Sequence, residues 1–153
     1  GPNMGKNLRS LLAIALLAVA SVFVWTSPAA AAETTITYQQ VDINGLDIVL
    51  SAANTDGSKF LNPTDERTFL VCANANAATR TVTVETQHAT ATLPGYGSIP
   101  LSDQAAVVPV TTGLTIIGPF PPSQFSDSSG YVHVTYSAVT DLTCGVGRLS
   151  RPQ

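Results

Sequence analysis

Residues 68–73 read TFLVCA and residues 80–85 read RTVTVE, and these two stretches decide the fold class. The first is apolar on both faces, which predicts a central strand of a sheet. The second alternates polar and apolar side chains, which predicts a strand that turns Val82 and Val84 toward a core. The stretch YVHVTYS at residues 131–137 alternates in the same way. We therefore expect a protein built of β-strands.

The rest of the chain supports an all-β domain. Gly, Pro, Asn, Asp and Ser interrupt it roughly every eight to twelve residues, which is typical of a β-sandwich or a β-barrel. Further strands are expected at residues 105–110, 114–117 and 143–149. The pattern predicts one small antiparallel sandwich or barrel of about seven to nine short strands.

Three segments are expected to turn or loop. Asn44-Gly45 suits a type I′ turn, which predicts a tight hairpin between the apolar residues on either side. Ala52 to Glu66 is expected to be a long loop with Phe60 as its apolar anchor, because it contains Asp56-Gly57 and Asn62-Pro63. Residues 88–102 are expected to be rich in turns.

Residues 4–32 have the pattern of a secretory signal peptide with a hydrophobic helix. Lys6 and Arg9 supply positive charge, and residues 11–25 are apolar except for one serine. This run of 15 residues is shorter than the roughly 20 that a membrane-spanning helix needs. An uncleaved membrane anchor is the alternative, and we expect cleavage because small residues follow the apolar run.

The cleavage site is expected between Ala32 and Glu33, after four consecutive alanines. Residues 1–3 precede the first methionine and are typical of what a protease leaves after removing an affinity tag. The mature part is then one β-sandwich domain, residues 33–153, found outside the cell or at its surface. It would contact a membrane only through the signal peptide, before cleavage.

The charge of this domain argues against nucleic acid as a partner. Lys6 and Arg9 account for two of the seven basic residues, which leaves five against ten acidic residues and a net charge of −5. Binding to phosphates needs clustered Lys and Arg, and here they are few and scattered. An anionic membrane surface is disfavoured for the same reason.

The two cysteines, Cys72 and Cys144, leave two alternatives open. Export makes a disulfide bond possible, and a bridge over so long a loop would add about 4 kcal/mol of stability in the chain-entropy model. The alternative is two buried free thiols in neighbouring strands, because cysteine is among the most buried residue types.

The sequence offers no recognisable chemical site. His88 and His133 lack neighbours at metal-ligand spacing, and we expect both on the surface. Gly97-Ser98 does not form the nucleophile elbow of a serine hydrolase, and Asp65-Glu66 is too sparse for a calcium loop. We therefore expect no catalytic residues, no metal site, no cofactor and no enzyme activity.

Two segments resemble the small β-rich head decoration proteins, or capsid cement proteins, of tailed bacteriophages. They are DERTFLVCANAN at residues 65–76 and IIGPFPPSQFSDSSGYVHVTYSAVTDLTCGVGRL at residues 116–149. The resemblance implies a structural protein without a catalytic site that coats a protein lattice, commonly as a homotrimer. Phage head proteins carry no export signal, so this chain departs from the family at residues 4–32.

If loops mediate such contacts, two of them are candidates. The first, 118–125, carries a GPFPP turn, and the second is the expected loop at 52–66. The candidate interface residues are Pro119, Phe120, Pro121, Pro122, Phe125 and Phe60. The alternative is that the GPFPP turn only reverses the chain and packs it.

The sequence thus supports three hypotheses for function. The first is an exported structural module that coats a protein surface or associates with itself, and is part of a virion if the phage resemblance holds. The second is a secreted cell-surface domain that binds a carbohydrate or protein. The third is an extracellular hydrolase whose carboxylates are distant in sequence.

Overall fold

The computed structural model describes residues 32–151 of the chain. The expected tag remnant at 1–3 and the expected signal peptide at 4–32, except for its last residue, lie outside the described part. Both stay predictions. Within residues 32–151, no helix has the length and apolar character needed to cross a bilayer. The described residues form one compact unit.

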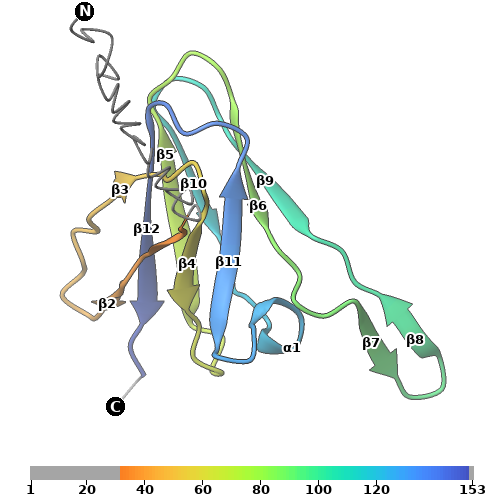
Figure 1. The fold of residues 1–153 in the computed structure, drawn as a ribbon. Coiled ribbons are helices and arrows are strands. Elements are labelled where there is room, and N and C mark those ends of the chain that lie inside the picture. Colours follow the sequence, from red (N-terminus) through yellow and green to blue (C-terminus); the bar gives the residue numbers. More distant parts are fainter. Residues whose placement is uncertain (1–31, 152–153) are drawn as a thin grey trace, which may run out of the picture. The chain divides into compact units, whose positions relative to one another are not determined.

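Residues 32–151 contain twelve strands in two larger sheets and one separate hairpin (Figure 1). The first sheet, here called the β11 sheet, has the order β1 (Thr34–Thr35), β4 (Ser58–Leu61), β11 (Tyr131–Tyr136), β6 (Arg80–Val84) and β9 (Gln104–Val108). The second, the β5 sheet, has the order β10 (Gly113–Ile117), β5 (Thr68–Asn74), β12 (Leu142–Leu149) and β2 (Tyr38–Val41), and β3 (Ser51–Ala52) also pairs with β12. The hairpin consists of β7 (Thr90–Leu93) and β8 (Gly97–Pro100), and the short helix α1 spans Pro122–Phe125.

The two sheets enclose one core, which makes the fold a sandwich. Alternate residues of each strand point inward, as Val82 and Val84 do in β6 and Val132 and Val134 do in β11. The core residues contributed by the β5 sheet are Leu70, Cys72, Leu142, Cys144 and Val146. The all-β prediction is therefore confirmed, and the choice between sandwich and barrel is decided by the two separate sheets.

Two details of that prediction differ. There are twelve strands where seven to nine were expected, because several strands have only two to four residues. Most pairs are antiparallel, but β1 pairs with β4 and β2 pairs with β12 in parallel. Both parallel pairs add a strand from the first part of the domain to the edge of a sheet.

The expected hairpin at Asn44-Gly45 does not form. Gly45 turns the chain at a φ of +87°, but β2 pairs with β12, and residues 45–50 join no ladder. The Gln39 side chain takes the place of a partner strand: its Nε2 donates to Val49 O and its Oε1 accepts from Val49 N–H, both at 2.9 Å. The amide group thus satisfies the Val49 backbone that a hairpin would have paired.

Two segments expected to be loops or turns contain strands. The segment Ala52 to Glu66 holds β4, which pairs with β11 and places Phe60 fully inside the core. Residues 88–102 hold β7 and β8, which pair with each other only. These strands were not predicted because each has only four residues and is flanked by residues typical of turns.

Candidate functional site

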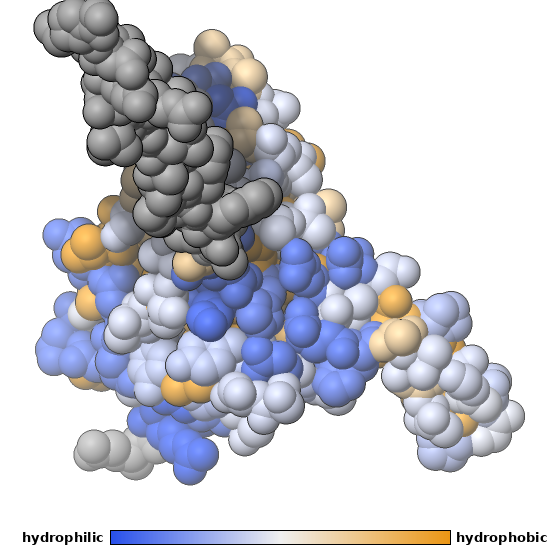
Figure 2. Space-filling view, viewed as in Figure 1, coloured by the Kyte–Doolittle hydropathy of each residue, from blue (hydrophilic) through white to orange (hydrophobic). Residues whose placement is uncertain are grey.

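The outer faces of the two sheets have opposite character. In β4, β6 and β11, the residues between the buried ones are Lys59, Thr81, Thr83, His133 and Thr135, so the middle of this outer face is polar. The edge strand β9 adds one exposed apolar residue, Val107, opposite Thr81. Figure 2 shows the side of the molecule nearest the viewer over β4 and β11 as mainly hydrophilic. A polar outer face is what solvent contact requires of one side of a sandwich.

The outer face of the β5 sheet is apolar. In β5, Leu70 and Cys72 point into the core, so Phe69 and Val71 point outward. Ile116 of β10 lies opposite Val71 in the register and is 66% exposed. Leu114, two residues before it, is 61% exposed. Neighbouring strands thus place large apolar side chains side by side on this face, where Leu114 and Ile116 are exposed, Phe69 is half-buried and Val71 is covered.

The chain covers one part of this face. The Val49 carbonyl lies close to Gly145 of β12: a Cβ added at Gly145 would be 2.5 Å from the Val49 carbonyl oxygen. The segment 45–50 therefore lies on the outer side of β12, where a glycine leaves room. Beside it a groove stays open, lined by Val41, Leu46, Ile48, Phe69, Val71, Leu114 and Ile116.

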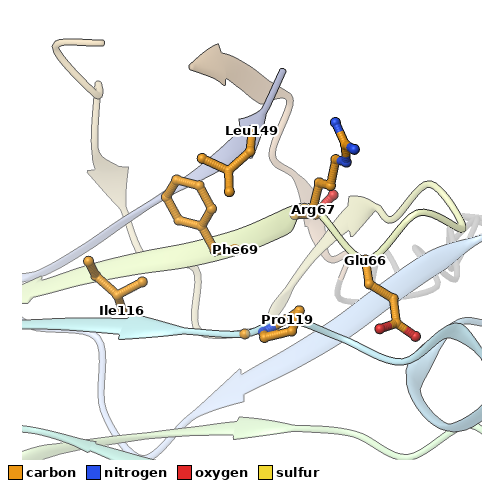
Figure 3. A pocket seen from close by; sticks show the side chains of 8 residues that line it. Glu66, Arg67, Phe69, Ile116, Pro119 and Leu149 are labelled. Carbon is orange, nitrogen blue, oxygen red and sulfur yellow. The ribbon is translucent and has the colours of Figure 1, made fainter. Parts of the chain in front are cut away.

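A second hollow continues the same surface toward the start of β5. Its lining shares Phe69 and Ile116 with the groove and adds Pro119 and Leu149, with Glu66 and Arg67 at its border (Figure 3). In Figure 3 the Leu149 side chain lies beside the Phe69 ring, while the Arg67 side chain points away from both. We call the groove and this hollow together the apolar face.

Gly147 of β12 shapes the apolar face. Gly147 lies opposite Phe69 in the register, and a Cβ at Gly147 would be 2.4 Å from the tip of the Phe69 ring. The end of the Phe69 ring therefore occupies the space over Gly147 of β12. Such a surface offers an incoming group contact with apolar side chains and removal from water. The residues that line the groove carry no titratable side chain.

A second feature lies on the outer side of the β11 sheet, where His133 stands between two carboxylates. His133 Nδ1 lies 2.8 Å from Glu33 Oε1, and Nε2 lies 2.7 Å from Asp127 Oδ2. Both partners are acceptors, so both ring nitrogens donate, which is the imidazolium form. The cluster ties the residue before β1 to β11 and to the turn that precedes it.

The hydrogen bonds of this cluster shift two pKa values. The bond from His133, helped by those from the Tyr131 and Ser129 backbone N–H groups, lowers the pKa of Asp127 to about 2. Partial burial lowers the pKa of His133, but the bonds to Asp127 and Glu33 outweigh it and raise that pKa above 6.5. With both nitrogens engaged, the ring is not free to take a proton from a substrate, and we assign it a structural role.

The two carboxylates contact opposite edges of the ring and do not converge on one point. Within the described residues, no group of three or more His, Cys, Asp or Glu side chains is placed to hold a metal ion. His133 lies on an outer face, as expected, but it is half-buried, and its contacts with two carboxylates were not expected. Its partner Glu33 lies 100 residues away in sequence, and no local pattern indicates the contact.

The interface residues predicted in the GPFPP turn lie partly in the core. Phe60, Phe120 and Phe125 are buried and pack against one another. The ring centroids are 5.3 Å apart for the tilted pair Phe60–Phe120 and 6.4 Å for the edge-to-face pair Phe120–Phe125. Asn62 Nδ2 donates to Phe120 O and to Ser126 Oγ, which holds the turn against β4. The interface prediction is wrong for these three rings, since the turn packs the chain, as the alternative stated.

The prolines of this turn have a different position. Pro119 is exposed and lines the apolar face, whereas Pro121 and Pro122 are half-buried around the start of α1. Pro119 is thus the one predicted contact residue that the fold brings to the candidate site. Leu114 and Ile116, the most exposed members of the face, were expected as a strand but not as a site.

The two cysteines form a disulfide bond. Cys72 of β5 and Cys144 of β12 lie directly opposite each other in the register, with Cα atoms 4.2 Å apart. Of the two alternatives that the sequence left open, the structure has the bridge. The predicted cleavage site, Ala32–Glu33, immediately precedes β1.

No protein-family model, curated protein or solved structure matches the chain. The resemblance to phage decoration proteins therefore stays a prediction.

Proposed function

We propose that this protein is an exported, non-enzymatic structural module that coats a protein surface or associates with itself through the apolar face. The observation that carries this proposal is the contiguous apolar surface on the outer side of the β5 sheet, with Leu114 and Ile116 more than half exposed. Single exposed apolar residues are common, but a contiguous apolar patch on a folded domain marks a binding site for another surface.

The chemistry of the face favours a protein as the partner. Its groove is lined by aliphatic side chains and one phenylalanine, without a titratable group to hold a charged ligand. Burying aliphatic surface is the main favourable term in protein association, at about 25 cal/mol per Å². The likeness of residues 65–76 and 116–149 to phage decoration proteins supports the same kind of role.

The test is the association state of the protein recovered after export of the full chain. Light scattering over a range of concentrations is expected to show association that weakens at least about tenfold in Ile116→Asp, because a buried unpaired carboxylate opposes contact. The matched control is Val107→Asp. Val107 is also β-branched and is 58% exposed, but it lies in β9 of the other sheet.

Equal effects of Ile116→Asp and Val107→Asp would contradict the proposal, because a general change of charge would then explain both. A wild-type protein that stays monomeric at high concentration would count against self-association. Urea unfolding of each variant shows whether the fold is intact. Both side chains are largely exposed, so we expect changes in unfolding free energy within about 0.5 kcal/mol.

A further inference from the structure

The β7–β8 hairpin, here called the arm, is the one part of the described chain whose strands join neither sheet. Figure 1 shows it extending away from both sheets. An isolated two-stranded hairpin is marginally stable in water, because it has no third strand or helix to cover a face. An arm of this kind gains stability when it packs against another surface.

The arm carries apolar side chains to its tip. Tyr96 is 84% exposed and lies between Gly95 and Gly97. These two glycines have φ values of +83° and +78°, which allow the chain to turn at the tip. Leu93 and Ile99 are also exposed on the two strands. In Figure 2 the arm is mostly pale with orange patches.

The arm is also free of charge. No Asp, Glu, Lys or Arg occurs between residues 89 and 102, although the domain has a net charge of −5. A surface hairpin without charged residues has a low cost of removal from water. This composition differs from that of an ordinary solvated loop, in which charged side chains are common.

The base of the arm is held by hydrogen bonds to the body. The Gln87 N–H donates to Gln124 O at 2.8 Å, and Gln124 Nε2 donates to Ser102 O at 3.2 Å, so both sides of the base contact α1. The Thr86 N–H donates to Asp103 Oδ1 at 2.8 Å and joins the two sides to each other. These contacts project the arm outward.

We propose that the arm of one copy of this chain docks its uncharged tip into the apolar face of a second copy. This inference rests on the proposed function and names the partner of the same surface. The arm and the groove match in character: the arm is uncharged and exposes Leu93, Tyr96 and Ile99, and the groove is lined by apolar side chains. Neither has a charged group that contact would desolvate, because Glu66 and Arg67 line the adjoining hollow and not the groove. Tyr96 is the anchor residue, since an aromatic side chain in an apolar pocket contributes strongly to protein contacts.

The proposed contact joins two different surfaces of the chain, so it is heterologous. Each copy offers one arm and one groove, and the contact repeats from copy to copy until a ring closes or a chain of copies grows. A face-to-face contact between two grooves would instead be isologous and would stop at two copies. The two arrangements therefore differ in how they respond to variants of the arm.

The experiment mixes two variants, each defective in one half of the contact. Tyr96→Asp removes the anchor and leaves the groove intact, and Ile116→Asp does the reverse. Each variant alone is expected to associate at least about tenfold more weakly than wild type. Mixed in equal amounts, they are expected to form complexes of two chains and no larger, because only one intact arm meets an intact groove. Native mass spectrometry gives the number of chains, and Val107→Asp is the control.

The outcomes separate this inference from the proposed function. If Ile116→Asp loses association and Tyr96→Asp keeps it, the face is a binding surface but the arm is not its ligand, and the inference is overturned. If the mixture forms complexes of more than two chains, the head-to-tail contact is refuted. If wild type is monomeric, or if neither variant changes association, both the inference and the proposed self-association are overturned.

Discussion

The disulfide between Cys72 and Cys144 closes a loop with a sequence separation of 72 residues, which contains β6 to β11. In the chain-entropy model, such a bridge stabilises the folded protein because it restricts the unfolded chain. The gain in unfolding free energy is roughly 3 kcal/mol for a loop of about 15 residues and about 4.7 kcal/mol for a loop of about 100. A loop of this size gives about 4 kcal/mol. Because domains are stable by only about 5–15 kcal/mol, reduction is expected to remove a large share of the stability.

Urea unfolding measures this directly. The exported protein is unfolded, reduced and refolded, and then titrated with reductant present throughout, beside an oxidised sample. We expect the unfolding free energy to fall by about 4 kcal/mol. The m-value is expected to rise, because the reduced unfolded chain exposes more surface. The double variant Cys72→Ala/Cys144→Ala is the control and is expected to unfold identically in both buffers.

A difference in unfolding free energy of less than about 1 kcal/mol between oxidised and reduced samples would contradict this prediction, since the bridge would then not restrict the unfolded chain as the model requires. It also fails if the double variant responds to reductant. Because both sulfur atoms are buried, reduction without prior unfolding is expected to be slow, and this offers a second check by thiol titration.

Three further predictions concern the His133 cluster, the core and the apolar face. The pKa of Asp127 is lowered from 3.8 to about 2, so this residue contributes stability that is present above pH 3.8 and lost toward pH 2. The pKa of His133 is raised above 6.5, so this residue contributes stability that is present below pH 6.5 and lost as the pH rises through the raised pKa. Urea unfolding as a function of pH is therefore expected to show both losses in wild type. Asp127→Asn is expected to lack the loss below pH 3.8 and to show a smaller loss above pH 6.5, because only Glu33 then remains beside His133. Phe120→Ala is expected to cost about 3–5 kcal/mol in urea unfolding, because the ring is buried among other phenylalanines, and a cost below about 1 kcal/mol would show that the turn is not part of the core. Gly147→Ala forces the Phe69 ring away from β12 and is expected to cost about 1–3 kcal/mol in thermal unfolding. In a Phe69→Ala background, adding Gly147→Ala is expected to cause no further loss relative to Phe69→Ala alone.

The strands that the sequence predicts well are those whose alternation reflects burial. Val82, Val84, Val132 and Val134 recur at every second position because one face of each strand meets the core. Residues 58–61 hold only one large apolar side chain that points inward, Phe60, so β4 carried too little pattern to be recognised. β7 and β8 lie outside the core, and burial therefore imposes no pattern on them.

The candidate site shows the same limit. Leu114 and Ile116 are recognisable as strand residues, but whether they face the core or solvent depends on where β10 pairs. Their exposure follows from the β5 register, which places Leu70 and Cys72 inward and Val71 outward. A one-residue shift in that register would reverse the two faces.

By itself, the sequence determined the β class, the inward positions of its longer strands and the net negative charge, because these depend on composition and local periodicity. Only the tertiary structure decided which strands are neighbours, that Cys72 meets Cys144, that Glu33 meets His133, and that one outer face stays apolar. The physical reason is that strands pair through backbone hydrogen bonds, which every residue except proline offers alike. The choice of partner is therefore made by packing among residues far apart in the chain.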